Sequence, residues 1–201
     1  MNATGTNATW LGGSIRGAAG PRPVVVKFGG SLLARRDWPA DLLAVVQRQG
    51  SPVTVVVGGG RIVDGLRELD AACPLPTAAS HRLAIEALGI TARVTAAATG
   101  LPLVATATAG ILDVPAWLGV DDRMLRLPEG WHVTSDSIAA IVAGTHGARL
   151  VLAKSAPPPP GDLAALSAAG WVDGFFPEAA AGLPVIEWMA PASGSPGWCS
   201  K

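Results

Sequence analysis

The chain has 201 residues, of which 49% are hydrophobic and 15% are charged. This length suits one domain with a buried core, and the composition is too apolar for a disordered protein. Lysine plus arginine and aspartate plus glutamate both number 15, so no excess charge favours nucleic acid or an anionic membrane surface. Any anionic ligand must therefore be held by a local site.

The two ends of the chain are expected to lie outside the folded domain. Residues 1–22 are rich in Ala, Gly, Thr and Asn and lack the pattern of a signal peptide, so we predict a disordered tail there, a domain over 23–190 and a second tail over 191–201. No segment reaches the ~18 consecutive apolar residues that would span a bilayer. Cys73 and Cys199 lie far apart without metal-ligand spacing, which favours a reducing cytoplasm.

Two units of strand, glycine turn and helix are predicted in the first third of the chain. In each unit a run of β-branched residues ends in glycines, and apolar residues at helical spacing follow. The predicted elements are a strand from Val24 to about Lys27, a helix from Asp37 to Gly50, a strand at Val53–Val57 and a helix through residues 62–69.

The rest of the chain continues this alternation less regularly. An alanine-rich stretch from Thr77 to about Ala98 predicts a helix with an interruption near Gly89. Glycine and proline break every periodic window between 107 and 131, so we predict irregular structure there. The other predicted elements are a short strand at 101–106, a helix from Thr134 or Ser135 to about His146, a strand at 150–153, a stiff connector at 157–160, a short helix at 162–169 and a strand at 184–188.

The alternation of strands and helices indicates an α/β fold. Parallel neighbours need crossover connections, which are right-handed and cover the faces of the sheet with helices. We therefore predict a three-layer αβα sandwich with a mainly parallel open sheet. In such a sheet ligands bind beyond the carboxyl ends of the strands, where both glycine turns are expected.

The glycine turns are candidate phosphate-binding sites. Glycine allows backbone N–H groups to approach a phosphate, and the helix that follows presents unpaired donors. Neither turn has the pattern of a P-loop or the spacing of a dinucleotide fold, and either turn could serve only to join a strand tightly to a helix. The candidate residues are Gly29, Gly30, Ser31, Gly58, Gly59 and Gly60.

Two lysines and one aspartate are candidates for the chemistry. Lys27 and Lys154 each end a hydrophobic strand, where an ammonium group could neutralise phosphate charge. Asp136 begins a predicted helix and could hold both ammonium groups in position. Alternatively, Lys27 only extends into solvent from a strand end, and Asp136 only caps its helix.

These motifs, taken in order, resemble the amino-acid kinase superfamily, which includes acetylglutamate, aspartate, uridylate and isopentenyl phosphate kinases. The resemblance covers most of residues 24–153 and rests on Val-Val-Val-Lys27-Phe-Gly29-Gly30-Ser31 and Val-Val-Val-Gly58-Gly59-Gly60. Three further stretches, at 80–85, 131–137 and 172–177, are similar to the small kinase of methanofuran biosynthesis, which phosphorylates an aminomethyl-furanmethanol phosphate.

The resemblance implies a phosphotransferase that uses ATP and Mg²⁺, acts on a small phosphorylated or carboxylated metabolite and forms a dimer or larger homo-oligomer. Lys27 and Asp136 would be catalytic, with Lys154 as the candidate second catalytic lysine, and both glycine turns would surround the phosphates. No nucleic-acid or membrane partner is expected, and no histidine trio has metal-ligand spacing. The candidate substrate-binding residues are Arg61, Asp64, His81 and Ser135.

The segment after the strand at 150–153 departs from the family. The kinases usually carry a Thr-Asp-Val-Asp-Gly-like nucleotide loop there, whereas this chain has Lys154-Ser155-Ala-Pro-Pro-Pro-Pro. Two interpretations remain open. The chain is either an active kinase in which Lys154 neutralises phosphate charge, or a catalytically degenerate member that binds a phosphorylated ligand as a regulatory or accessory protein.

Overall fold

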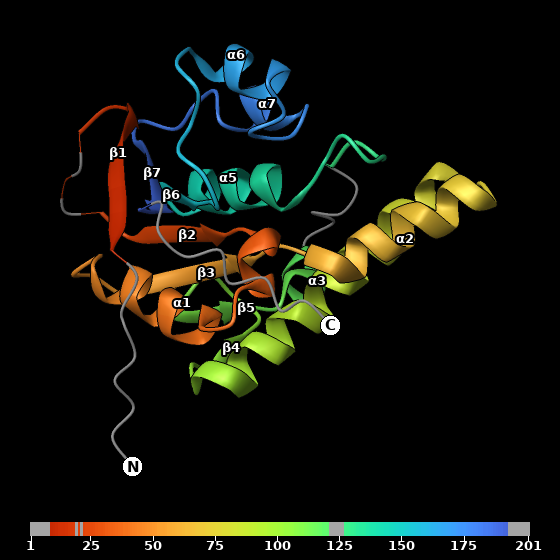
Figure 1. Ribbon diagram of the computed structural model, residues 1–201, viewed down its shortest axis with the longest axis horizontal. Helices are drawn as coiled ribbons and strands as arrows, with labels where there is room; N and C mark the ends of the chain where they lie inside the picture. Colours follow the sequence, from red (N-terminus) through yellow and green to blue (C-terminus); the bar gives the residue numbers. More distant parts are fainter. Residues whose placement is uncertain (1–8, 19, 21, 121–126, 193–201) are drawn as a thin grey trace.

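A sheet between two layers of helices forms the centre of the computed structural model, which describes residues 9–18, 20, 22–120 and 127–192 (Figure 1). Its strands are β1 (Trp10–Arg16), β2 (Val24–Phe28), β3 (Val53–Val57), β4 (Leu103–Val104), β5 (Gly110–Leu112), β6 (Arg149–Ala153) and β7 (Ile186–Pro191). They lie in the order β1-β7-β6-β2-β3-β5-β4, and only the β1–β7 pair is antiparallel among the described strands. The predicted α/β sandwich with a mainly parallel open sheet is confirmed.

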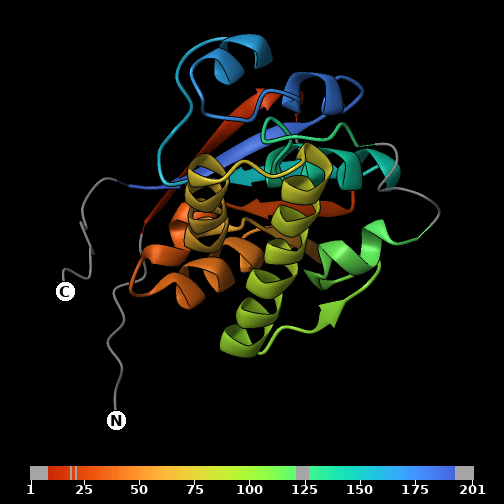
Figure 2. The same ribbon diagram turned by 90° about the vertical axis from the view of Figure 1, so that its right-hand side faces the viewer.

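The helices cover both faces of the sheet. They are the 3₁₀ helix η1 (Gly30–Ala34) and α1 (Trp38–Gln47), α2 (Gly60–Ala72), α3 (Thr77–Thr99), α4 (Val114–Leu118), α5 (Ser135–Thr145), α6 (Leu163–Ala168) and α7 (Phe176–Ala179). Figure 1 shows α5 on one face with α6 and α7 beyond it, and α1 and α3 on the other face. Figure 2 shows α2 and α3 side by side, as their packing contacts require.

Alternation along β2 decides which layer each side chain faces. Val24 and Val26 belong to the buried cluster on the α1 face, whereas Val25 belongs to the cluster that contains Ile138 of α5. Successive side chains of a strand point to opposite faces. Lys27 therefore shares the α5 face with Val25, which places its ammonium group beneath the first turn of α5.

The disordered tail predicted over 1–22 is wrong for Trp10–Arg16, which form β1 and pair with β7 from Trp10↔Pro191 onward. The high Ala, Gly, Thr and Asn content had favoured disorder, but a Cβ at Gly13 would lie 2.7 Å from Nε1 of Trp188. The glycine thus permits close packing within the sheet. Pro191 ends β7, so it does not belong to the predicted second tail, whose residues 193–201 lie outside the described residues, as do 1–8.

The middle of the chain is more regular than predicted. Helix α3 continues through Gly89, where a Cβ would meet Cγ of Pro115 at 2.8 Å, so this glycine permits packing against α4 and does not interrupt the helix. The stretch 107–131 contains β5 and α4, whose N-terminus is capped by the Asp113 carboxylate accepting from the Ala116 N–H. These elements have three and five residues, too few to show a period.

The other predicted elements are present with shifted ends. Helix α5 starts after the N-cap Thr134, as expected, and the strand predicted at 184–188 lies at Ile186–Pro191. Only Leu103–Val104 of the strand predicted at 101–106 is extended. Within the described ranges, none of the helices combines the length and hydropathy needed to cross a bilayer.

Candidate active site

The two glycine turns touch each other backbone to backbone at the carboxyl ends of β2 and β3. A Cβ at Gly30 would lie 2.3 Å from the backbone nitrogen of Gly60, and one at Gly58 would lie 2.5 Å from that of Gly30. Gly60 also has φ +53°, which favours glycine. Close packing of the turns therefore explains three of the glycines without a ligand, and it also brings the two sets of backbone N–H groups to one place.

The N-terminus of α2 lies at the second glycine turn and has no side-chain cap. Its N-cap Gly59 makes no side-chain capping bond, and its first turn contains no acidic residue. The first N–H groups of a helix lack intrahelical partners and carry partial positive charge. Together with the guanidinium of Arg61, they could bind an anionic group.

Lys27, Asp136 and Lys154 form one buried ion cluster. Lys27 Nζ lies 2.8 Å from Oδ1 of Asp136, and Lys154 Nζ lies 2.7 Å from Oδ2. The three side chains are 6%, 7% and 14% exposed, respectively. The structure thus brings the three predicted catalytic residues together, while their catalytic role stays a prediction.

Burial and mutual charge set the protonation of this cluster. Burial raises the pKa of Asp136, but the charges and hydrogen bonds of the two lysines outweigh burial, so its pKa lies below the ordinary value. Burial and then repulsion from Lys27 lower the pKa of Lys154 to about 8, although attraction to Asp136 works in the opposite direction. Lys154 is therefore easier to deprotonate than an ordinary lysine.

Asp173, which sequence reasoning did not select, fixes the start of α5. One oxygen of its carboxylate accepts from the Thr134 N–H, the Thr134 hydroxyl and the Ser137 N–H at 2.7–3.0 Å, and the other accepts from the Ser137 hydroxyl and the Phe175 N–H. The N-terminus of α5 is thus closed by the protein's own carboxylate, in contrast to that of α2. The sequence pointed to this residue only indirectly, because Asp173 lies in the stretch 172–177 that is similar to the small kinase of methanofuran biosynthesis.

The backbone near Asp173 also contacts Lys154. The carbonyl of Trp171 accepts from Lys154 Nζ at 2.5 Å, and the same ammonium lies 5.1 Å from the centre of the indole ring. The indole N–H in turn donates to the carbonyl of Ala156 at 3.0 Å. The segment at 171–173 therefore orients both Lys154 and the first turn of α5.

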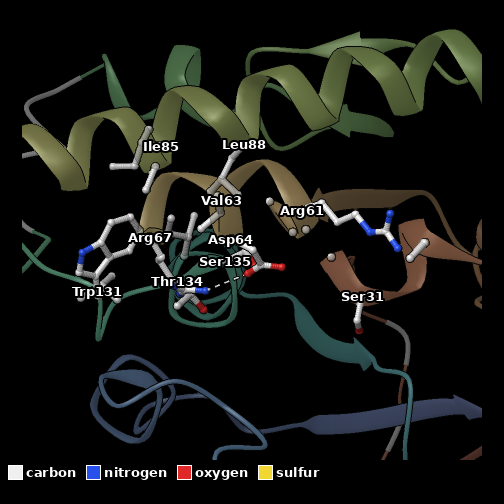
Figure 3. Close-up of a pocket in the computed structure, with 18 of the residues that line it drawn as sticks. Ser31, Arg61, Val63, Asp64, Arg67, Ile85, Leu88, Trp131, Thr134 and Ser135 are labelled. Carbon is white, nitrogen blue, oxygen red and sulfur yellow. Dashed lines mark hydrogen bonds and ion pairs between the residues drawn. The ribbon is translucent and has the colours of Figure 1, made fainter. Parts of the chain in front are cut away.

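A cavity of about 570 Å³ opens between α2, α3 and the start of α5 (Figure 3). Nine of the residues that line it were predicted to bind phosphate or substrate: Gly30, Ser31, Gly58, Gly59, Gly60, Arg61, Asp64, His81 and Ser135. Lys27, Gly29, Asp136 and Lys154 do not line it. Sequence reasoning had not selected Arg67, Trp131 and Ser155, which also line the cavity.

Contacts with α2 hold Trp131 and Arg67 in one wall of the cavity. The Trp131 indole N–H donates to Asp70 at 2.7 Å, and the guanidinium of Arg67 lies 5.1 Å from the centre of the Trp131 ring. Arg67 also lies 3.4 Å from the Asp64 carboxylate. Hydrogen bonds from the Leu75 N–H and from Trp131 hold the pKa of Asp70 below its ordinary value.

The residues present fit a phosphorylated ligand better than a protein-bound metal. In the described part of the chain, no group of three or more His, Cys, Asp or Glu side chains is placed to hold a metal ion. Mg²⁺ commonly uses substrate phosphates as its main ligands. A magnesium ion here would depend on the oxygens of a bound nucleotide.

Comparisons with known proteins agree with the fold and the motifs. Residues 22–157, more than half of the chain, match the amino acid kinase family. A protein named as a LysW-aminoadipate/LysW-glutamate kinase of Aeropyrum pernix is 50% identical over 40 residues, which are 20% of this chain and 15% of that protein.

Two solved structures resemble the chain along most of its length. The UMP kinase from Ureaplasma parvum has a TM-score of 0.56 at 12% identity, covering 85% of this chain and 99% of that one. The UMP kinase from Bacillus anthracis has a TM-score of 0.50 at 14% identity, covering 86% and 97%. At these identities the likeness concerns the fold.

Proposed function

This chain belongs to the amino acid kinase family, and we propose that it is a phosphotransferase that moves the γ-phosphoryl group of ATP to a small phosphorylated or carboxylated metabolite. This proposal rests mainly on the buried cluster in which Lys27 and Lys154 both pair with the Asp136 carboxylate, beside the two glycine turns that touch each other. Asp136 orients the two ammonium groups before any ligand arrives, which is the preorganisation that electrostatic catalysis requires.

Phosphoryl transfer needs positioning and positive charge more than covalent help. We propose that the open N-terminus of α2 and the N–H groups after β2 hold the phosphate oxygens, while Lys27 and Lys154 stabilise charge that develops during transfer. ATP with Mg²⁺ would supply the phosphoryl group. Ser31 and Ser155, whose hydroxyls lie 3.4 Å apart, would border the site on the β6 side.

The acceptor would occupy the cavity between α2 and α3. Arg61 follows the second glycine turn and Ser135 lies beside Gly58, so both would contact the phosphate of the acceptor, and Asp64 and His81 would contact the rest of the molecule. A furan-methyl phosphate of methanofuran-type cofactor biosynthesis is one acceptor that we propose, because the stretches at 80–85 and 131–137 contribute His81, Trp131 and Ser135 to this cavity. Nucleoside monophosphates and carboxylates are further candidate acceptors, because the similar proteins are named as UMP kinases and as a LysW-aminoadipate/LysW-glutamate kinase.

A screen for ADP release tests this function. The panel would contain phosphorylated furans, isoprenoid monophosphates, nucleoside monophosphates and amino acids, each with ATP and Mg²⁺. Lys27→Met should abolish turnover while keeping the fold, since it keeps the length of the side chain and removes the charge. Arg36→Ala, which removes a positive charge from an exposed residue outside the cavity, should leave turnover unchanged. Equal turnover by Lys27→Met and the wild type would refute the proposal.

A non-catalytic, ligand-binding member of the family is the second candidate. It is favoured by the segment after β6, where four prolines, Pro157–Pro160, follow Lys154 and where the Trp171 indole closes onto Ala156. This candidate predicts no thermal stabilisation by nucleotide. A ligand at 100 times its dissociation constant stabilises the folded state by about 2.7 kcal/mol. Stabilisation by ATP with Mg²⁺ would therefore exclude the second candidate in its simplest form.

We also propose that the chain forms a homo-oligomer through α3. Leu83, Ile90 and Val94 are exposed and, at spacings of seven and four, lie on one face of the helix. A charged residue in a closed interface is strongly unfavourable. Light scattering should therefore show a smaller mass for Val94→Glu than for the wild type, and equal masses would contradict this proposal. The cytoplasmic location stays a prediction.

A further inference from the structure

The first turn of α5 is capped twice. Thr134 is its N-cap residue, and the hydroxyl oxygen of Thr134 accepts from the Asp136 N–H at 3.3 Å. This local bond is the ordinary way to cap a helix. The carboxylate of Asp173 lies in the loop between α6 and α7 and adds bonds to the same turn, although it is 39 residues from Thr134 in the sequence. The second cap therefore requires a role beyond starting the helix.

Asp173 holds the residues on both sides of Asp136. On one side, the N–H and the hydroxyl of Thr134 donate to Asp173 at 2.9 and 2.7 Å. On the other side, the N–H and the hydroxyl of Ser137 donate to the same carboxylate. The backbone of Asp136 is thus fixed between two residues that cannot move without breaking these bonds.

The position of the Asp136 carboxylate is critical for the ion cluster. Each of its oxygens pairs with one ammonium group, at 2.8 Å from Lys27 and at 2.7 Å from Lys154. A rotation of the first turn of α5 would lengthen at least one of these pairs. A displacement of about 1 Å in a catalytic arrangement can reduce the rate by about 100-fold. The groups that fix the backbone of Asp136 therefore matter for the chemistry.

Asp173 also acts on Lys154 through its charge. The main charged groups around this ammonium are Lys27 of β2, Asp136 of α5 and Asp173 of the α6–α7 loop, and the Trp171 carbonyl accepts a hydrogen bond from it. Burial and then repulsion from Lys27 lower the pKa of Lys154. Attraction to Asp136 and, less strongly, to Asp173 raises it. Asp173 thus helps to keep the second lysine protonated.

We propose that Asp173 is a positioning residue for phosphoryl transfer, which holds the Asp136 carboxylate between the two ammonium groups and keeps Lys154 charged. This inference rests on the proposed function, in which the cluster stabilises charge during transfer. Asp173 does not line the cavity, so its effect passes through Asp136 and Lys154. An interaction that acts mainly in the transition state changes kcat more than KM.

Steady-state kinetics separate this role from a purely structural one. The assay is ADP release with ATP, Mg²⁺ and the most active acceptor of the panel above. Asp173→Asn keeps the size of the side chain and removes its charge, so kcat should fall by about 10- to 100-fold while both KM values stay within about 3-fold. Asp162→Asn is the matched control, because it removes an exposed aspartate cap from α6 and should keep the wild-type kcat. Equal kcat values for the two variants would overturn the inference.

The titration of Lys154 tests the inference without a ligand. The chain has three lysines, so carbon-13-labelled lysine gives a simple NMR spectrum in which Lys154→Met assigns the signal of Lys154. Asp173→Asn should lower the pKa of Lys154, because an attractive charge is lost, and Asp162→Asn should leave it unchanged. A merely loosened α5 would instead hydrate the ammonium group and raise its pKa. A pKa that rises or stays constant in Asp173→Asn therefore contradicts the inference.

Amide hydrogen exchange of the wild type tests the same contacts whether or not the variants fold. Ser137 and Ile62 are the third residues of α5 and α2, respectively. The Ser137 N–H donates to Asp173 and should be protected, whereas α2 has no side-chain cap and the Ile62 N–H should exchange faster. Equal exchange of the two amides would show that Asp173 does not hold the turn.

The outcomes distinguish this inference from the proposed function. A wild-type protein that releases no ADP with any acceptor would refute the proposed function, and the titration of Lys154 would then decide alone whether Asp173 positions the cluster. ADP release with a wild-type kcat in Asp173→Asn would leave the kinase proposal intact and remove only the role of Asp173.

Discussion

The lowered pKa of Lys154 makes the stability of the protein depend on alkaline pH. The pKa falls from 10.5 to about 8 in the folded state, chiefly because the ammonium group is buried. Each pKa unit corresponds to about 1.4 kcal/mol. Keeping Lys154 protonated in the folded protein below pH 8 therefore costs about 3 kcal/mol of the free energy of unfolding.

The sign follows from proton binding. Between about pH 8 and 10.5 the unfolded chain holds the Lys154 proton and the folded chain has lost it, so the free energy of unfolding rises with pH. Besides Lys154, the side chains that ordinarily titrate in this range are two lysines and two cysteines, because the chain has no tyrosine. We therefore expect a gain of about 3 kcal/mol across this range, where ordinary proteins lose stability.

Urea denaturation followed by the fluorescence of the seven tryptophans measures this gain. The free energy of unfolding would be determined at several pH values from 7.5 to 10.5 for the wild type and for Lys154→Met. The variant keeps the length of the side chain and removes the titrating group, so its curve should lack the rise. A wild-type curve that is flat or falls relative to the variant would refute the assignment of a buried, charge-repelled Lys154.

Two further substitutions test the elements that position the site. Asp173→Asn should lower the free energy of unfolding by about 2–3 kcal/mol, because a carboxylate that accepts several hydrogen bonds is replaced by an amide that must direct donors at donors. Urea denaturation of this variant within ~0.5 kcal/mol of the wild type would contradict the cap. Gly58→Ala should cost about 1–3 kcal/mol, since its Cβ meets the backbone of Gly30, whereas Gly65→Ala, inside α2 in open space, should be neutral or stabilising. Equal thermal midpoints for both alanine variants would contradict the close packing of the turns.

Local patterns in the sequence determined the order of the longer elements. β-branched runs such as Val53–Val57 are buried on both faces, and their short length and β-branched content favour a strand over a helix. The same patterns placed Lys27, Asp136 and Lys154 at strand ends and at a helix start. Because carboxyl ends of parallel strands meet at one edge, their proximity in space could be expected from sequence alone.

Tertiary structure alone decided what the glycines and the distant polar groups do. From the sequence alone, Gly13 and Gly89 favour coil or a break in a helix. In the structure, the lack of a Cβ makes room for Trp188 at Gly13 and for Pro115 at Gly89, and both partners are distant in sequence. Likewise, nothing local to Asp173 shows that its carboxylate closes the N-terminus of α5. Local propensity determines the order of strands and helices along the chain. Close packing and long-range hydrogen bonds depend instead on which distant segments the completed fold brings together.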